Sequence, residues 1–208
     1  MEHEDGFPLF PLGMVLLPSE ATLLHIFEDR YKDLAERCLD DGQQFGLVLT
    51  DDDGAPGEWG CATTIEQVIQ RYDDGRLDVL VKGVEPIRVV EVEDRFSYPS
   101  ARIERVIDSP AGYTEPDQAG RTHAAFAALL DALAAEPVEP VELSGLSAYE
   151  MAAQIELDTH DKQMLLELRD EGARLANLER IFSDATEGVL AARKLAIHAQ
   201  SNGHVKRG

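Results

Sequence analysis

The stretch from Phe7 to Leu49 constrains the fold of this 208-residue chain more than any other. Its centre is an amphipathic helix, predicted from Asp29 to Asp41 because apolar residues recur there at intervals of three and four. Those residues are Tyr31, Leu34, Ala35, Cys38 and Leu39. Gly42 follows as a helix-ending residue, and the apolar runs Thr22–Phe27 and Phe45–Thr50 predict buried strands on either side. Strand, helix and strand from adjacent segments make a local nucleus onto which later strands can add.

The next sixty residues have the alternation of β-structure. Leu77, Val79 and Val81 alternate with more polar neighbours, as in a half-buried strand. Before them, Asp73–Arg76 (DDGR) is a hairpin signal. Residues 7–107 are therefore predicted to form a mostly β unit with one early helix.

The composition changes after residue 107. Asp108–Gly120 is rich in proline, glycine and acidic residues, which is typical of a linker, and Thr122–Ala135 has a helical pattern. Beyond Ser147 leucines recur at helical spacing almost continuously. We expect an α+β chain with a β subdomain over 1–110, a linker over 111–121, a helical subdomain over 122–200 and a flexible tail over 201–208.

The charge of the chain limits its partners. Nineteen Lys and Arg against 40 Asp and Glu give a formal net charge of −21. Such a surface disfavours nucleic acids and anionic membranes, because affinity for phosphates comes largely from Lys and Arg. The amino terminus has no signal-peptide pattern and no apolar run has the length of a membrane helix, so a cytoplasmic protein is expected. Cys38 and Cys61 are too few for a disulfide framework or a four-cysteine zinc site.

Nucleotide-binding and catalytic motifs are missing from the sequence. Neither a P-loop nor a G-x-G-x-x-G motif occurs, and no lysine lies in the Gly- and Ser-rich surroundings of a catalytic nucleophile. Asp158 and His160 have residue types that suit a transition metal, but we prefer the interpretation that Asp158, Thr159 and Asp161 begin a helix, with His160 beside them in solvent. His25 is interpreted as a core or edge histidine. We predict no cofactor, no metal and no catalytic residue.

Aromatic and basic residues near loops of the β unit are the candidates for a binding site. We select Trp59, Phe96 and Tyr98 as aromatic anchors and Arg30 and Arg95 as polar ones. Trp59, the only tryptophan, has two interpretations, a plug of the core or an exposed anchor of a binding groove.

Several short motifs are similar to a known family. PLFPL at residues 8–12, VLLP at 15–18, LHIFE at 24–28 and FG at 45–46 resemble the amino-terminal, substrate-binding domain of Lon-type ATP-dependent proteases. The resemblance continues through Gly60, Gly75 and Gly83 and, more loosely, through the helical half. One departure is that the Arg-Phe-Arg usual after the glycine at 83 is replaced here by Pro86-Ile87-Arg88. The resemblance implies a PUA-like β pseudo-barrel followed by a helical subdomain.

Four functions remain open at this point. The resemblance implies a non-catalytic module that binds unfolded or partner polypeptides and lacks ATPase and peptidase domains. An acidic adaptor or oligomerisation module is the alternative. A nucleic-acid binder is disfavoured by the charge, and a hydrolase with an unrecognised site is disfavoured by the missing motifs.

Overall fold

The structure, a computed structural model, describes residues 3–51, 53–109, 117–134 and 145–202, with side chains up to residue 196. The chain divides into two compact units. Unit 1 comprises Met1–Pro110 and Tyr149–Arg169, and unit 2 comprises Ala111–Ala148 and Asp170–Gly208. The strands lie in unit 1, and helices occur in both units, so the predicted α+β class is confirmed.

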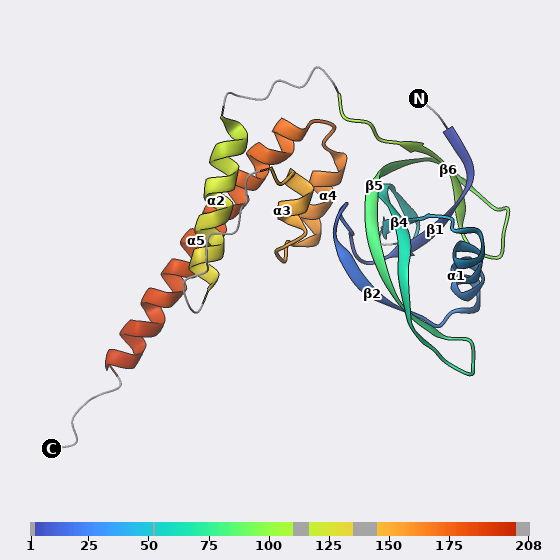
Figure 1. The fold of residues 1–208 in the computed structure, drawn as a ribbon, viewed down its shortest axis with the longest axis horizontal. Coiled ribbons are helices and arrows are strands. Elements are labelled where there is room, and N and C mark those ends of the chain that lie inside the picture. The colour runs from blue at the N-terminus through green and yellow to red at the C-terminus, as the bar shows by residue number, and fades with distance from the viewer. Residues whose placement is uncertain (1–2, 52, 110–116, 135–144, 203–208) are drawn as a thin grey trace. The chain divides into compact units, whose positions relative to one another are not determined.

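The strands of unit 1 form one six-stranded sheet that closes on itself (Figure 1). They are β1 (His3–Leu12), β2 (Ala21–Ile26), β3 (Phe45–Thr50), β4 (Pro56–Arg71), β5 (Leu77–Glu93) and β6 (Ser100–Arg105). Their order is β2-β5-β4-β3-β1-β6, and β6 also pairs with β5. Five strands therefore form a closed barrel, β5-β4-β3-β1-β6, while β2 lies outside it. Among the six strands in the described part of the chain, β1 and β3 alone pair in parallel, which suits two strands joined by a crossover.

The long strand β5 changes its partner halfway along. Residues 77–82 of β5 pair with β2, and residues 87–93 pair with β6. The change occurs around Gly83, where a Cβ atom would lie 2.1 Å from the carbonyl oxygen of Leu17. Only glycine permits the Leu17–Pro18 segment to approach β5 so closely. Beyond the barrel, β2, β5 and β4 continue as a three-stranded extension that ends in the β4–β5 hairpin (Figure 1).

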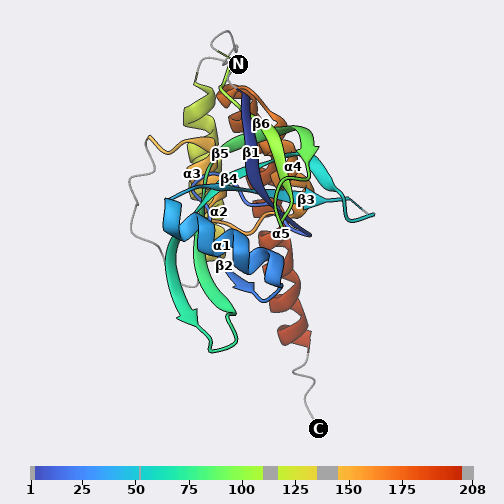
Figure 2. The ribbon, with the colours of Figure 1, turned by 90° about the vertical axis from the view of Figure 1, so that its right-hand side faces the viewer.

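Helix α1 (Asp29–Asp41) begins and ends at the predicted residues. Gly42 closes it in the left-handed conformation, with φ 64°, and its N–H donates to the carbonyl of Cys38. Helix α1 lies against the strands (Figure 2). Its apolar face is buried there through Tyr31, Leu34, Ala35 and Cys38. A first core cluster joins this face to β1, β2, β3 and β5. A second cluster is formed by residues of the barrel strands: Phe7, Leu9, Val48, Ala62, Ile87, Val89, Ala101 and Ile103.

Two short helices that we assigned to the helical subdomain pack with the strands instead. They are α3 (Ala148–Ala152) and α4 (Thr159–Glu167), and unit 1 includes Tyr149–Arg169. Lys162 of α4 forms an ion pair with Glu20, and the N–H of Ser109 donates to the carbonyl of Arg169 over 2.8 Å. The physical reason is burial, because Leu165 and Leu166 of α4 are almost completely excluded from solvent.

Unit 2 is a pair of helices, α2 (Gln118–Leu133) and α5 (Glu171–Asn202). The rings of Phe126 and Phe182 lie 5.0 Å apart between them, and Thr122 Oγ1 donates to the carbonyl of Leu175. Helix α2 begins at Gln118, inside the expected linker, and most of the remaining linker lies outside the described residues, as does the expected tail from residue 203. Within the described residues no helix has the length and apolar character needed to cross a membrane.

Candidate functional site

The loop Asp94–Pro99, which joins β5 to β6, is held against α1 by three side-chain contacts. Ser97 Oγ donates to Asp33 Oδ2 over 2.7 Å. Arg37 donates from Nη1 to the hydroxyl of Tyr98 over 3.1 Å, and its guanidinium carbon lies 4.4 Å from the ring centre of Phe96. The rings of Phe96 and Tyr98 also stack, with their centres 5.2 Å apart. These contacts fix the loop, so the side chains that it carries are preorganised.

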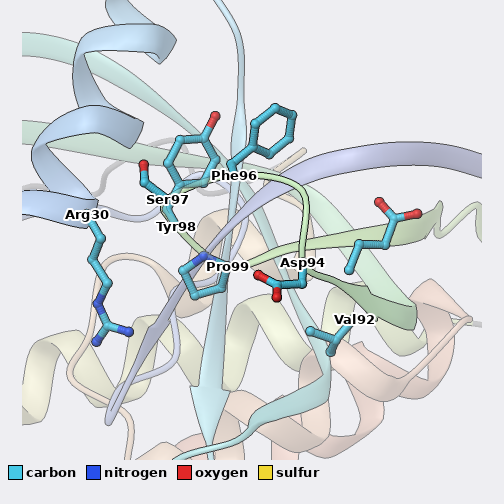
Figure 3. A pocket seen from close by; sticks show the side chains of 8 residues that line it. Arg30, Val92, Asp94, Phe96, Ser97, Tyr98 and Pro99 are labelled. Atoms are coloured by element: carbon cyan, nitrogen blue, oxygen red, sulfur yellow. The ribbon is translucent and has the colours of Figure 1, made fainter.

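Beside this loop lies a pocket of about 360 Å³, a volume within the range of small-ligand sites (Figure 3). Eight residues line it: Arg30, Val92, Glu93, Asp94, Phe96, Ser97, Tyr98 and Pro99. Figure 3 shows Arg30 on one side, Val92 and Asp94 on the other, and Pro99 between them. Val92 is 53% exposed, whereas Tyr98 is only 5% exposed. The pocket therefore offers accessible apolar surface above a rigid base.

Charges of both signs border the pocket. Arg30 reaches it from the first turn of α1 and forms an ion pair of 2.9 Å with Glu28. Asp94 is exposed and has no ion pair among the described residues. Glu93 is mostly enclosed and accepts hydrogen bonds of 2.8 Å from the N–H of Gly6 and from Arg95. The arrangement can therefore hold an apolar group and a neighbouring cation.

Tyr98 keeps its proton in this setting. Burial raises the pKa of its phenol, and the hydrogen bond from Arg37 only partly opposes that shift. Because Arg37 is the donor, the Tyr98 O–H remains able to donate elsewhere.

The structure brings three of the five predicted site residues together. Arg30, Phe96 and Tyr98 all line the pocket. Arg95 is adjacent in sequence, but its guanidinium is engaged by Glu93 and does not line the cavity. Trp59 lies elsewhere on β4, half-buried, where it is paired with Arg88 of β5. The Arg88 guanidinium carbon is 6.0 Å from the Trp59 ring centre, so Trp59 is neither a deep core plug nor a freely exposed side chain.

The sequence interpretation of Thr22–Phe27 as a buried strand was wrong for one of its faces. Leu24 and Ile26 are buried in the core cluster that includes the apolar face of α1, but Leu23 is 65% and Phe27 59% exposed. A continuous apolar run suggests that both faces of a strand are buried, but here the face with Leu23 and Phe27 is exposed to solvent. His25, which we placed in the core or at an edge, lies in this edge strand and bonds through Nδ1 to Asp78 Oδ1 over 2.5 Å.

The Asp158 region was correctly interpreted as a helix start. Asp158 caps α4 by accepting a hydrogen bond of 2.8 Å from the N–H of Asp161. The cap explains the acidic residues around His160 without a metal.

Known proteins similar to this chain share one description. Residues 6–183 match the family model of the ATP-dependent protease La (LON) substrate-binding domain. Among curated proteins, a LON peptidase N-terminal domain and RING finger protein of Schizosaccharomyces pombe is 30% identical over 127 residues, which are 52% of this chain and 26% of that protein. Lon protease 1 of Bacillus subtilis is 23% identical over 209 residues, covering 93% of this chain and 27% of that protein. The chain thus spans about a quarter of the length of these relatives.

Solved structures agree with this assignment. A Lon N-terminal domain protein from Xanthomonas campestris superposes with a TM-score of 0.64 at 25% identity, covering 86% of this chain and 97% of that one. The N-terminal domain of a Mycobacterium avium complex Lon protease has a TM-score of 0.62 at 17% identity over 88% and 98% of the two chains, a likeness of fold. The chain belongs to the Lon substrate-binding domain family.

Proposed function

We propose that this chain is a non-catalytic module that binds unfolded or partner polypeptide segments, and that the pocket beside the loop Asp94–Pro99 is one of its contact sites. Membership of a substrate-binding domain family supports polypeptide as the class of ligand. The sequence contains neither a P-loop nor a recognisable nucleophile, which supports binding without ATP hydrolysis or peptide cleavage.

One observation of the site carries this proposal: exposed apolar surface at the end of β5 and a carboxylate that has no ion pair among the described residues line the same pocket beside a fixed loop. Val92 and Phe96 present apolar surface, and Asp94 lies between them in sequence and lines the same cavity. A polypeptide needs this combination, because an apolar side chain supplies the buried area and a charged or polar group sets its orientation. The affinity is expected to be micromolar or weaker, about −8 kcal/mol at 1 μM or less favourable.

The test is fluorescence anisotropy with a labelled, permanently unfolded protein, such as α-lactalbumin whose reduced cysteines carry aminoethyl groups, because these groups add positive charges and avoid repulsion by the net charge of −21. Native α-lactalbumin at the same concentration is the control for the folded state. We expect saturable binding of the unfolded form only. Absence of binding to the unfolded form at tens of micromolar would refute the proposal.

A matched pair of variants tests the pocket. Val92→Asp places a charge on its exposed apolar surface, and Ile107→Asp places the same charge on a side chain that is 77% exposed and does not line the pocket. Val92→Asp is expected to weaken binding at least about fivefold, whereas Ile107→Asp should stay within about twofold, or ~0.4 kcal/mol, of the original. Equal effects of the two variants would remove the pocket from the binding surface and leave the module's function to be located elsewhere.

A further inference from the structure

We infer that the free edge of β2 binds its polypeptide by strand addition, and that the segment bound is extended, carries apolar side chains at alternate positions and has a net positive charge. This inference rests on the proposed function and specifies how the polypeptide is held. It concerns the backbone of β2 (Ala21–Ile26), which is separate from the pocket tested above.

One edge of β2 is unpaired among the strands that the structure describes. β2 pairs with β5 alone, in a regular register from Ala21 opposite Lys82 to Ile26 opposite Leu77. Immediately before β2, the N–H of Gly83 donates to the carbonyl of Glu20 over 2.9 Å. In an antiparallel pair, hydrogen-bonded and non-bonded residues alternate. Residues 22, 24 and 26 therefore bond to β5, and residues 21, 23 and 25 direct their N–H and C=O groups to the free edge.

The extension has a second edge, and it is protected. Residues 64–71 of β4 pair with β5 only, because the pairing of β3 with β4 ends at Thr63. This stretch has two irregularities of register, between Ile65 and Gln67 and between Val68 and Gln70. It also contains Glu66 and Arg71, and Arg71 forms an ion pair with Glu36 of α1. Bulges and charges are the usual means of blocking an edge.

β2 has none of these protections. Its sequence, ATLLHI, contains no lysine, arginine, aspartate, glutamate or proline, and its register with β5 has no bulge. Six residues present three outward peptide groups, enough for a short added strand. An edge of this kind is a template for another strand.

The side chains beside the edge specify what the added strand should carry. Leu23 and Phe27 are 65% and 59% exposed on the solvent face of β2. Between them, the Nδ1 atom of His25 is held by Asp78 Oδ1. Directly opposite residues of neighbouring strands lie ~4.5–5.5 Å apart and interact. An added strand with apolar side chains at every second position would therefore cover Leu23 and Phe27.

The edge also leads to the pocket of the proposed function. β2 ends at Ile26, and Arg30, which lines that pocket, follows four residues later. Four residues span at most ~14 Å. A smaller cavity of about 50 Å³ lies in the intervening segment and is lined by Ile26, Phe27 and Tyr31, among others. One extended segment can therefore occupy both the edge and the pocket.

The net charge of the chain indicates which kind of polypeptide binds the edge of β2. A second copy of this chain would bring another net charge of −21 to the edge, and like charges repel. A segment flanked by lysines or arginines is attracted by the same field. The occupant is therefore a segment of a different, basic polypeptide.

The test uses a fluorescent peptide of about nine residues, alternating leucine and threonine between terminal lysines. This length covers the six residues of β2 and leaves about three residues over. Two derivatives carry N-methyl groups, one on the leucine amides and the other on the threonine amides. An added strand bonds through only one of these alternating sets. We expect one derivative to lose at least about tenfold in affinity, equal to ~1.4 kcal/mol, while the other binds within about threefold of the parent.

Two substitutions in β2 test the same edge from the protein side. Leu23→Pro removes an outward N–H without touching the ladder to β5, a position at which proline is tolerated in edge strands. Leu23→Ala removes the same side chain and keeps the N–H, so it is the matched control. We expect the proline variant to bind the parent peptide at least about fivefold more weakly than the alanine variant, with circular dichroism confirming that both are folded.

The outcomes separate the two proposals. If the parent peptide and unfolded α-lactalbumin both fail to bind, the proposed function fails. If the parent binds but both methylated derivatives bind as well as it does, or both lose equally, strand addition is refuted and the polypeptide-binding function stands. Sedimentation of a dimer that Leu23→Pro dissociates would also refute the inference, because a second copy would then be the occupant. If Leu23→Pro is unfolded, the methylated peptides alone decide.

Discussion

The hydroxyl of Tyr98 accepts a hydrogen bond of 3.1 Å from Arg37, which lies 61 residues earlier in the chain. This bond joins α1 to the loop Asp94–Pro99 and thereby fixes one wall of the pocket. Tyr98→Phe keeps the ring and removes the acceptor. We expect the free energy of unfolding to fall by ~0.5–1.5 kcal/mol, measured by urea denaturation, because the Arg37 guanidinium loses this acceptor and keeps, among the described residues, only its contacts with Asp41 and the Phe96 ring.

A double-mutant cycle with Arg37→Ala isolates this hydrogen bond. If the bond is formed in solution, the two substitutions should be non-additive by ~0.5–1.5 kcal/mol. Strict additivity would mean that the loop is held by its stacking and by Ser97 alone.

Trp59→Ala should lower stability by less than the ~3–5 kcal/mol typical of a fully buried large aromatic side chain. The reason is that Trp59 is half-buried and packs beside Arg88 at the surface of the barrel. The variant protein should bind unfolded polypeptide with unchanged affinity, since Trp59 lines neither the pocket nor the edge of β2. A loss of binding with intact stability, measured by anisotropy and thermal denaturation, would instead identify Trp59 as an anchor.

Gly83→Ala should destabilise unit 1 strongly, by ~1–3 kcal/mol or more. The added Cβ would lie 2.1 Å from a backbone oxygen of Leu17, which cannot move aside as a flexible side chain could. Gly13→Ala is the control, because a Cβ there meets nothing within 4 Å. Thermal denaturation of both variants measures the difference, and equal melting temperatures would show that β5 does not pass so close to Leu17.

The two cysteines should be unreactive in the folded protein. Burial raises the pKa of both Cys38 and Cys61 to about 12, so neither forms appreciable thiolate at pH 8. We expect no reaction with a thiol reagent such as DTNB until urea unfolds the protein, when two thiols per chain react. Rapid reaction in the native state would place at least one cysteine at the surface.

The same shifts predict the direction of a pH dependence. Unfolded thiols ionise near pH 9, while the folded ones hold their protons to about pH 12. This stabilising contribution is complete below pH 9 and is lost as the pH rises from 9 toward 12. The double variant Cys38→Ala, Cys61→Ala should lack this part of the alkaline decline.

Local patterns in the sequence predicted local structure well. Helix α1 and strand β3 have the predicted bounds, because helix periodicity, a terminal glycine and an apolar run are properties of adjacent residues. Strand β2 begins and ends one residue earlier than predicted, at Ala21 and Ile26. The error on Leu23 and Phe27 arose because an apolar run does not reveal which neighbour covers each face.

Long-range partners were the part that sequence could not supply. Leu165 and Lys162 have the pattern of any amphipathic helix, and nothing in that pattern states that Lys162 meets Glu20, 142 residues away. The same holds for the candidate site. Arg30 and Arg95 looked equivalent in the sequence, but the direction of each side chain depends on its ion-pair partner, Glu28 for one and Glu93 for the other.

The position of β1 in the barrel has a consequence for synthesis on the ribosome. Among the barrel strands, β1 is made first and its neighbour β6 last. Glu4 and Arg105, which form an ion pair across these two strands, are 101 residues apart. At ~5–20 residues per second, ~5–20 s pass between the synthesis of Glu4 and that of Arg105, and β1 gains its neighbour β3 only after Phe45–Thr50 has been made. Throughout that interval at least one edge of this partly apolar strand is unpaired. A chaperone that bound this edge until Arg105 was made would protect the nascent chain from wrong strand pairing.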